Sequence, residues 1–102
     1  MAREPGLILY GTCWCADCAQ ARRFLKARGV KWRDVDVDED PAAERRVLGF
    51  QRGARLVPVF EYEGRHVTVS PFDRGKLSRW LLEVGAATAA QVSDAAPSGP
   101  GT

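Results

Sequence analysis

Three cysteines lie between a short apolar segment and a stretch of helical pattern, and their placement constrains the fold more than any other feature of the chain. Cys13, Cys15 and Cys18 follow the apolar residues 7–10, and the helical pattern begins at residue 16. Free N–H groups and the helix dipole at a helix N-terminus favour a thiolate and lower the pKa of a thiol. We therefore expect a strand that leads directly into a helix with the cysteines at its start.

Within this motif, Cys15 is the best-placed nucleophile. Cys18 comes three residues later, almost one helical turn on, so its sulfur lies on the same face of the helix. From there it can attack a mixed disulfide that has formed at Cys15. The spacing predicts that Cys15 opens a thiol–disulfide exchange and that Cys18 resolves it.

Length and composition narrow the class of protein. The chain has 102 residues, of which 45% are hydrophobic, and this predicts one compact domain. It has no apolar run of about 18 residues, residues 1–6 lack the core of a signal peptide, and the net charge is only +2. We therefore expect a cytoplasmic monomer that binds neither membrane nor nucleic acid. In the cytoplasm thiols are kept reduced, so the clustered cysteines indicate catalysis or metal binding rather than a structural disulfide.

The remaining pattern predicts the order strand, helix, strand, helix, strand, strand, helix. Asp40 and Asp73 are expected to cap the second and third helices, and Gly49 and Gly85 to end them. A parallel βαβ unit, an antiparallel hairpin and a closing helix imply an α/β fold with a mixed four-stranded sheet and helices on both faces. Strands are expected at 7–10, 35–37, 57–62 and 65–69, with a turn at 63–64, and helices at 16–28, 40–48 and 73–84.

Beyond Gly85 the composition shifts to Ala, Ser, Gly, Pro and Thr. Such a segment offers too little apolar surface to offset the entropy of ordering. We expect a domain over residues 1–85 and a disordered tail over 86–102. A helical turn at 86–92 is the alternative, and no function is assigned to it.

These motifs together resemble the glutaredoxin group of the thioredoxin-like superfamily. The resemblance covers residues 6–84 and rests on residues 10–18, the strand at 35–37, the Val57–Pro58 pair and residues 72–77. It implies a thioredoxin-like, glutaredoxin-type fold in three layers with the order βαβαββα. It also implies a disulfide reductase that acts as an electron donor.

The resemblance also implies the roles of several further residues. In this family the proline before the third strand is cis and faces the redox pair, which here is Pro58. The backbone of the preceding residue, Val57, would pair with the thiol substrate as an added strand does. Trp14 would flank and shield the disulfide, while Arg55 and the amides near Asp73 would bind the carboxylates of glutathione or another small thiol.

The chain departs from the family pattern in ways that bear on its electron source. Many glutaredoxins have Pro and Tyr between the cysteines, where this chain has Ala16 and Asp17. Asp17 either raises the cysteine pKa and makes the couple more reducing, or complements the helix N-terminus. Residues 72–74 resemble small glutaredoxin-like proteins that take electrons from thioredoxin reductase. We expect no bound cofactor, with either a small thiol such as glutathione or thioredoxin reductase with NADPH as the source.

Three other positions carry weaker signals. Cys13 is interpreted as a small apolar residue rather than as an alternative disulfide partner, a site of glutathionylation or a metal ligand. Adjacent Cys-X-Cys pairs close strained rings, and the sequence does not show four good metal ligands. His66 is expected on a strand surface without a role. Arg22 and Arg23 are either the solvated face of the first helix or a source of positive potential near Cys15.

Three classes of function follow from these observations. The leading one is a thiol–disulfide oxidoreductase that reduces protein or mixed disulfides through Cys15 and Cys18. The second is an iron–sulfur or metal carrier that uses the same cysteines. The third is a non-catalytic interaction module, and the intact Cys-X-X-Cys and Val57–Pro58 motifs argue against it.

Overall fold

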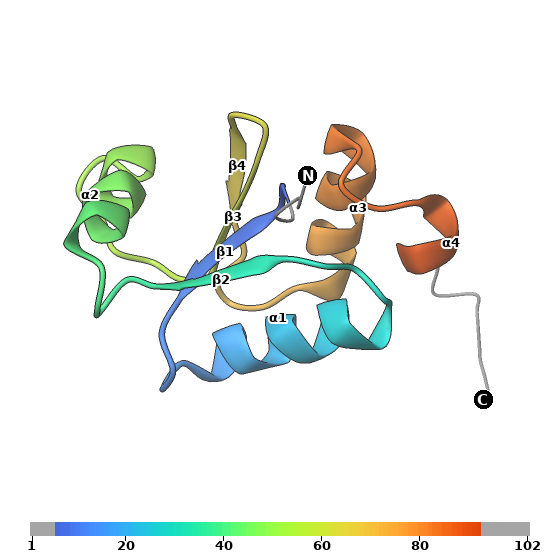
Figure 1. The fold of residues 1–102 in the computed structure, drawn as a ribbon, viewed down its shortest axis with the longest axis horizontal. Helices are drawn as coiled ribbons and strands as arrows, with labels where there is room; N and C mark the ends of the chain where they lie inside the picture. Colours follow the sequence, from blue (N-terminus) through green and yellow to red (C-terminus); the bar gives the residue numbers. More distant parts are fainter. Residues whose placement is uncertain (1–5, 93–102) are drawn as a thin grey trace, which may run out of the picture.

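A computed structural model describes residues 6–92 and shows a four-stranded mixed sheet covered by helices (Figure 1). The strand order is β2-β1-β3-β4, with β1 parallel to β2 and both other pairs antiparallel. This arrangement confirms the predicted α/β fold. The elements are β1 (Ile8–Gly11), α1 (Ala16–Ala27), β2 (Arg33–Asp36), α2 (Pro41–Phe50), β3 (Val59–Tyr62), β4 (Arg65–Thr68), α3 (Arg74–Val84) and α4 (Ala89–Val92).

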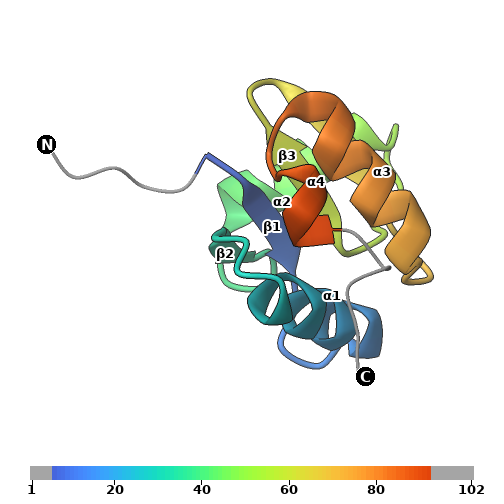
Figure 2. The ribbon, with the colours of Figure 1, turned by 90° about the vertical axis from the view of Figure 1, so that its right-hand side faces the viewer.

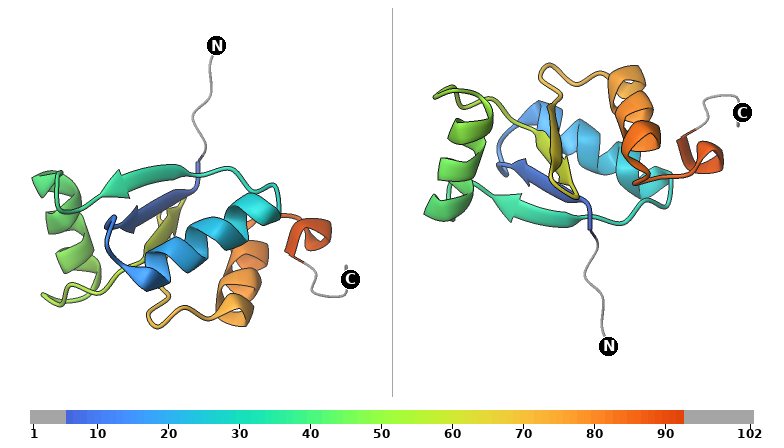
Figure 3. Two further views of the ribbon diagram at one scale, coloured as in Figure 1. Left: turned by 90° about the horizontal axis from the view of Figure 1, so that it is seen from below. Right: turned by 90° about the horizontal axis from the view of Figure 1, so that it is seen from above.

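The helices form the two outer layers around the sheet. Helices α1 and α3 lie on one face and α2 lies on the other, as the views along the sheet show (Figure 3). Alternate residues of each strand point to opposite faces, so Leu9 and Phe60 join the α1/α3 core while Tyr10 and Val59 join the α2 core. Each face therefore has its own apolar cluster, and β1 contributes to both.

Local signals place the helix ends. The Asp40 carboxylate accepts the Ala43 N–H at 3.1 Å, and the Asp73 carboxylate accepts the Lys76 N–H at 3.0 Å. Gly85 ends α3 with a φ of 82°, a left-handed conformation that glycine adopts at little cost. These three predicted boundaries are confirmed.

The end of α2 differs from the prediction. Gly49 was expected to end this helix, but α2 continues through it to Phe50. The Phe50 ring makes an edge contact with Tyr10, at 6.3 Å between centroids, and stacks on His66 at 4.1 Å. These tertiary contacts favour two more helical residues and outweigh the low helix propensity of a single glycine.

Ordered structure also continues past the predicted domain boundary. Residues 86–92, expected to begin a disordered tail, include α4, which lies beside α3 (Figure 2). Val92 is only 4% exposed and joins the cluster under α1 and α3, with Ala86 and Ala87 packed against it. The rest of the predicted tail, residues 93–102, lies outside the described residues. Within residues 6–92 none of the helices has the length and apolarity needed to cross a bilayer.

Candidate active site

Cys15 lies at the N-cap of α1, where its backbone is extended with φ −86° and ψ 121°. Its Sγ accepts the N–H of Cys18 at 3.3 Å. A side chain in this position satisfies one of the free donors of the first turn, and the helix dipole favours negative charge there. The half-buried Cys15 therefore accepts a hydrogen bond from the helix while a substrate can still reach it.

Cys18 occupies the opposite environment. Its side chain is 0% exposed and lies in the first turn of α1 below Cys15. Burial is the largest effect on this thiol and raises its pKa to about 12, against the lowering effect of a hydrogen bond from the backbone of Thr12. Cys18 is therefore a protonated, protected thiol, which suits the second rather than the first nucleophile.

The segment before β3 lies opposite the cysteines. The Val57–Pro58 peptide bond is cis, as predicted, and the Cys15 Sγ donates to the Val57 carbonyl oxygen at a long 3.9 Å. The predicted strand at 57–62 begins only at Val59, so Val57 and the buried Pro58 form its entry. The contact brings Val57, one of the predicted site residues, to the Cys15 sulfur.

Gln51, which sequence reasoning missed, fixes the backbone of this segment. Its side-chain oxygen accepts the N–H of Leu56, and its Nε2 donates to the Leu56 carbonyl, both at 2.8 Å. The same Nε2 lies 2.9 Å from the hydroxyl of Thr68 on β4. The glutamine thereby ties the half-exposed Leu56 to the sheet.

Trp14 and Arg55 meet through an acidic residue. The indole of Trp14 is 68% exposed and its Nε1 donates to Asp38 at 2.7 Å. Arg55 also pairs with Asp38, and its Nε lies 2.9 Å from a carboxylate oxygen of Glu44. These hydrogen bonds, that of Trp14 first, lower the pKa of the Asp38 carboxyl. Asp38, which the sequence analysis did not single out, connects two candidate substrate-binding residues.

Asp73 has a structural task. Its carboxylate caps α3 by accepting the Lys76 N–H, so the first-turn amides are partly satisfied within the chain. Asp17, in the first turn of α1, is half-buried, and both interpretations of its effect on the cysteines stay predictions.

Cys13 and His66 lie apart from the chemistry described so far. Cys13 is an exposed free thiol. His66 is exposed on β4 and stacks on Phe50, which agrees with the surface position expected for it. Across residues 6–92, His, Cys, Asp and Glu side chains form no group of three or more that could hold a metal ion.

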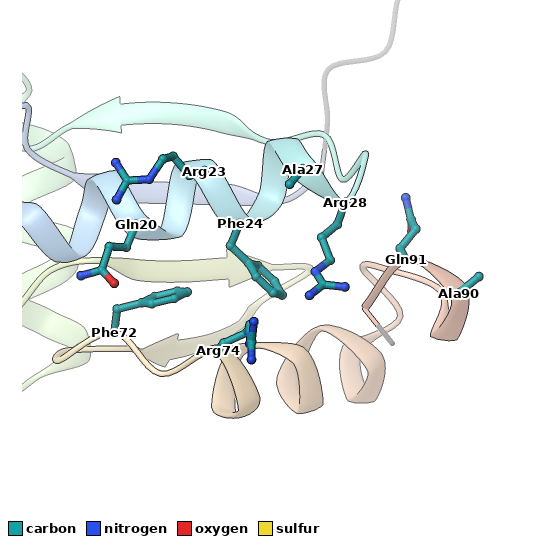
Figure 4. Close-up of a pocket in the computed structure, with 9 residues that line it drawn as sticks. All are labelled: Gln20, Arg23, Phe24, Ala27, Arg28, Phe72, Arg74, Ala90 and Gln91. Atoms are coloured by element: carbon teal, nitrogen blue, oxygen red, sulfur yellow. The ribbon is translucent and has the colours of Figure 1, made fainter. Parts of the chain in front are cut away.

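An open groove of about 640 Å³ runs along α1 on the α3 side (Figure 4). Figure 4 shows Gln20 pointing from α1 toward Phe72, which lies below the helix. Arg23 lines this groove, and none of the three cysteines does. Its lining residues are Gln20, Arg23, Phe24, Ala27, Arg28, Phe72, Arg74, Ala90 and Gln91.

Comparisons with known proteins agree on one family. Residues 7–67 match the family model described as Glutaredoxin. A glutaredoxin of Pseudomonas aeruginosa is 30% identical over 63 residues, which is 62% of this chain and 74% of that protein. A crystal structure of a thioredoxin-like protein variant has a TM-score of 0.64 at 28% identity and covers 78% of this chain and 96% of that one. A buckwheat glutaredoxin in complex with glutathione shares the fold, with a TM-score of 0.60 at 24% identity over 81% of this chain and 82% of that one.

Proposed function

The chain belongs to the glutaredoxin family, and from this premise we propose that it reduces protein disulfides or mixed disulfides through Cys15 and Cys18. One observation carries the proposal. The Cys15 sulfur caps α1 and accepts the N–H of Cys18, while the second sulfur is fully buried directly behind it. This asymmetry gives the first attack to Cys15 and reserves Cys18 for the second.

The reaction follows from these positions. The Cys15 thiolate attacks a substrate disulfide, forms a mixed disulfide and releases one substrate sulfur as a thiolate. Cys18 then attacks the Cys15 sulfur, which forms the intramolecular disulfide and releases the second substrate sulfur. The substrate is reduced by two electrons and the cysteine pair is oxidised by two electrons.

Substrate backbone would bind beside the reactive sulfur. We propose that the backbone of Val57 pairs with the substrate as an added strand, and that Pro58 shapes this entry to β3. Trp14 offers an exposed apolar surface next to Cys15, and its bond to Asp38 fixes the indole. These contacts would hold the substrate while the sulfur exchange proceeds.

Proteins of this family typically use glutathione, and the buckwheat relative binds it. In this chain Arg55 already pairs with Asp38 and Glu44, so a glutathione carboxylate would have to compete with two acids of the protein. Thioredoxin reductase with NADPH is therefore the second candidate source. Two parallel assays distinguish these sources. The oxidised protein is incubated either with glutathione and glutathione reductase or with thioredoxin reductase and NADPH, and the assay that shows turnover identifies the electron source.

Substitution of each cysteine tests the proposed roles. Cys15→Ser should abolish turnover, whereas Cys18→Ser should lose dithiol reduction of insulin and keep only reactions that one thiol completes with an added small thiol. Cys13→Ser is the matched control, and it should keep insulin reduction. Insulin reduction by Cys18→Ser at the parent rate would show that Cys18 is not the resolving residue.

The metal-carrier alternative is not favoured, since the described residues bring together no group of three or more His, Cys, Asp or Glu side chains that could hold a metal ion. We also propose that the protein works as a monomer in the cytoplasm, where a small thiol or a reductase returns the pair to the dithiol. Its partners would then be disulfide-containing proteins and that electron source.

A further inference from the structure

Arg22 lies one helical turn after Cys18 and is held in place from two sides. Its Nε donates to both carboxylate oxygens of Asp34 on β2, at 3.2 and 3.1 Å. Its Nη2 donates to the Thr12 carbonyl at 3.3 Å. A guanidinium with three acceptors in a fixed arrangement has little freedom to swing into solvent.

The fixed guanidinium lies next to the buried sulfur. Gly11 ends β1, and the position that a Cβ would occupy there is 2.8 Å from the Cys18 Sγ and 3.3 Å from the Arg22 Nη2. The Cys18 Sγ and the Arg22 Nη2 thus both lie close to the space that a side chain at Gly11 would fill. The guanidinium and the thiol therefore lie within about 6 Å of each other.

We propose that Arg22 stabilises the Cys18 thiolate during the resolving step and that Asp34 is the positioning residue that holds Arg22 beside it. This inference rests on the proposed function, because it concerns the second of the two sulfur exchanges. One interpretation of the sequence was that Arg22 adds positive potential near Cys15. The inference instead assigns the effect of Arg22 to Cys18.

The neighbours of Cys18 explain why the resolving step needs this charge. Burial opposes ionisation, as do the hydrogen bond and the charge of Cys15, while the Thr12 N–H and Arg22 favour it. Once Cys15 is in a mixed disulfide, its sulfur carries no charge and both of its opposing effects disappear. Thr12 and Arg22 then remain as the groups that favour the Cys18 anion against burial.

The step balances without a further reactant. The Cys18 thiol gives its proton to solvent, and the resulting thiolate forms a bond with the Cys15 sulfur. The bond between Cys15 and the substrate sulfur breaks with its electron pair, and the substrate leaves as a thiolate that can take up a proton. A nearby cation lowers the cost of the transient anion in a site of low polarity.

A chromogenic aromatic disulfide, dithiobis-nitrobenzoate, separates the two exchanges. All variants carry Cys13→Ser, so that the first release of aromatic thiolate reports attack by Cys15 and the second reports resolution by Cys18. Arg22→Gln should slow the second release a few-fold at neutral pH and raise its pH midpoint, because the Cys18 thiolate loses a nearby positive charge. The first release should keep its rate.

Matched variants distinguish charge from packing. Arg22→Lys should restore most of the rate and the midpoint, and Asp34→Asn should shift both in the same direction as Arg22→Gln but less. Arg23→Gln, on the next position of the same helix, should behave as the parent. An Arg22→Gln protein that melts at a lower temperature but keeps the parent midpoint of the second release would overturn the inference. A parent without a first release would instead overturn the proposed function.

Discussion

Each face of the sheet buries an ionisable group of the reactive or ion-paired kind, and the pKa values of these two groups shift in opposite directions. On the α1/α3 face, Cys18 is 0% exposed and burial raises its pKa to about 12. On the α2 face, Glu61 of β3 is 7% exposed, yet its pKa is lowered, first by its hydrogen bond with Arg46. Burial alone therefore does not decide the charge state of a group in this fold.

The difference lies in the donors that surround each group. Glu61 accepts the Tyr10 hydroxyl at 2.7 Å and the Arg46 Nε at 2.8 Å, so its charge is fully paired. Cys18 is favoured as an anion only by a backbone hydrogen bond of Thr12 and by the charge of Arg22. A buried group that is always charged, such as Glu61, needs several direct partners. A buried thiol such as Cys18, which ionises only during the reaction, is neutral the rest of the time.

The largest expected effect comes from removing the paired charge. Glu61→Ala should lower the free energy of unfolding by about 2 to 3 kcal/mol, because the buried Tyr10 hydroxyl loses its acceptor and Arg46 loses its partner. Urea unfolding measures it, with Glu83→Ala on the exposed side of α3 as the control, expected within about 0.5 kcal/mol of the parent. Equal losses in both variants would show that the α2 face does not depend on its carboxylate.

The same substitution should change the behaviour in acid. The lowered pKa of Glu61 means that its contribution is present above its ordinary value of 4.5 and is lost as the pH falls through the folded-state value. The parent should therefore lose more stability below pH 4.5 than Glu61→Ala does. Parallel acid slopes for the two proteins would contradict this.

The second prediction concerns the space beneath Cys18. A Cβ on Gly11 would lie 2.8 Å from the Cys18 Sγ and 3.0 Å from the Leu9 Cδ2, and both side chains are fully buried. Gly11→Ala should therefore cost about 1 to 2 kcal/mol in urea unfolding of the reduced protein, because an overpacked core must shift. Unchanged stability would show that the Cys18 sulfur can move aside freely. The distance between Arg22 and Cys18 would then not be fixed by packing.

The third prediction concerns the effect of Cys18 on stability at alkaline pH. The folded thiol stays neutral to about pH 12 while the unfolded thiol ionises from its ordinary value of 9.0, so stability should fall as the pH rises through this window. Cys18→Ala should make the free energy of unfolding fall less steeply with pH, by at most about 1.4 kcal/mol per pH unit. The variant also loses the packing of the sulfur, but that loss is the same at every pH and does not change the slope. Unfolding under reducing conditions between pH 9 and 11 measures it.

Tyr10 supplies the matched comparison for this slope from the other face. Burial first, and then the bond to Glu61, raise its pKa to about 12, so Tyr10→Phe should also flatten the alkaline fall. A Cys18→Ala protein with the full slope of the parent would mean that the thiol is less isolated from solvent than its burial indicates.

Local signals in the sequence predicted much of the fold and only part of the site. The N-caps Asp40 and Asp73 and the left-handed Gly85 depend on neighbours within four residues, so they could be predicted from the chain alone. Asp38 and Gln51 act on residues far away in the sequence or across a turn, and no local pattern marks them. Their roles require the tertiary fold.

The buried network on the α2 face was missed for the same reason. Tyr10, Arg46 and Glu61 come from three separate elements, and in the sequence each reads as an ordinary strand or surface residue. Val92 was likewise assigned to a tail because a single aliphatic residue in a polar segment gives no period. Both meet their partners only when β1, β3, α2 and α4 have come together.

The smallest predicted effect uses a second glycine, on the α2 face. Gly49 lies inside α2, and a Cβ there would meet nothing within 4 Å, in contrast to Gly11 under the reactive thiol. Gly49→Ala should therefore raise the free energy of unfolding by about 0.5 to 1 kcal/mol, because alanine loses less backbone entropy in a helix. Opposite signs for the two glycine variants in urea unfolding would mean that close packing is concentrated at the cysteine side of the sheet. A loss in Gly49→Ala would instead show that α2 needs the glycine to reach Phe50.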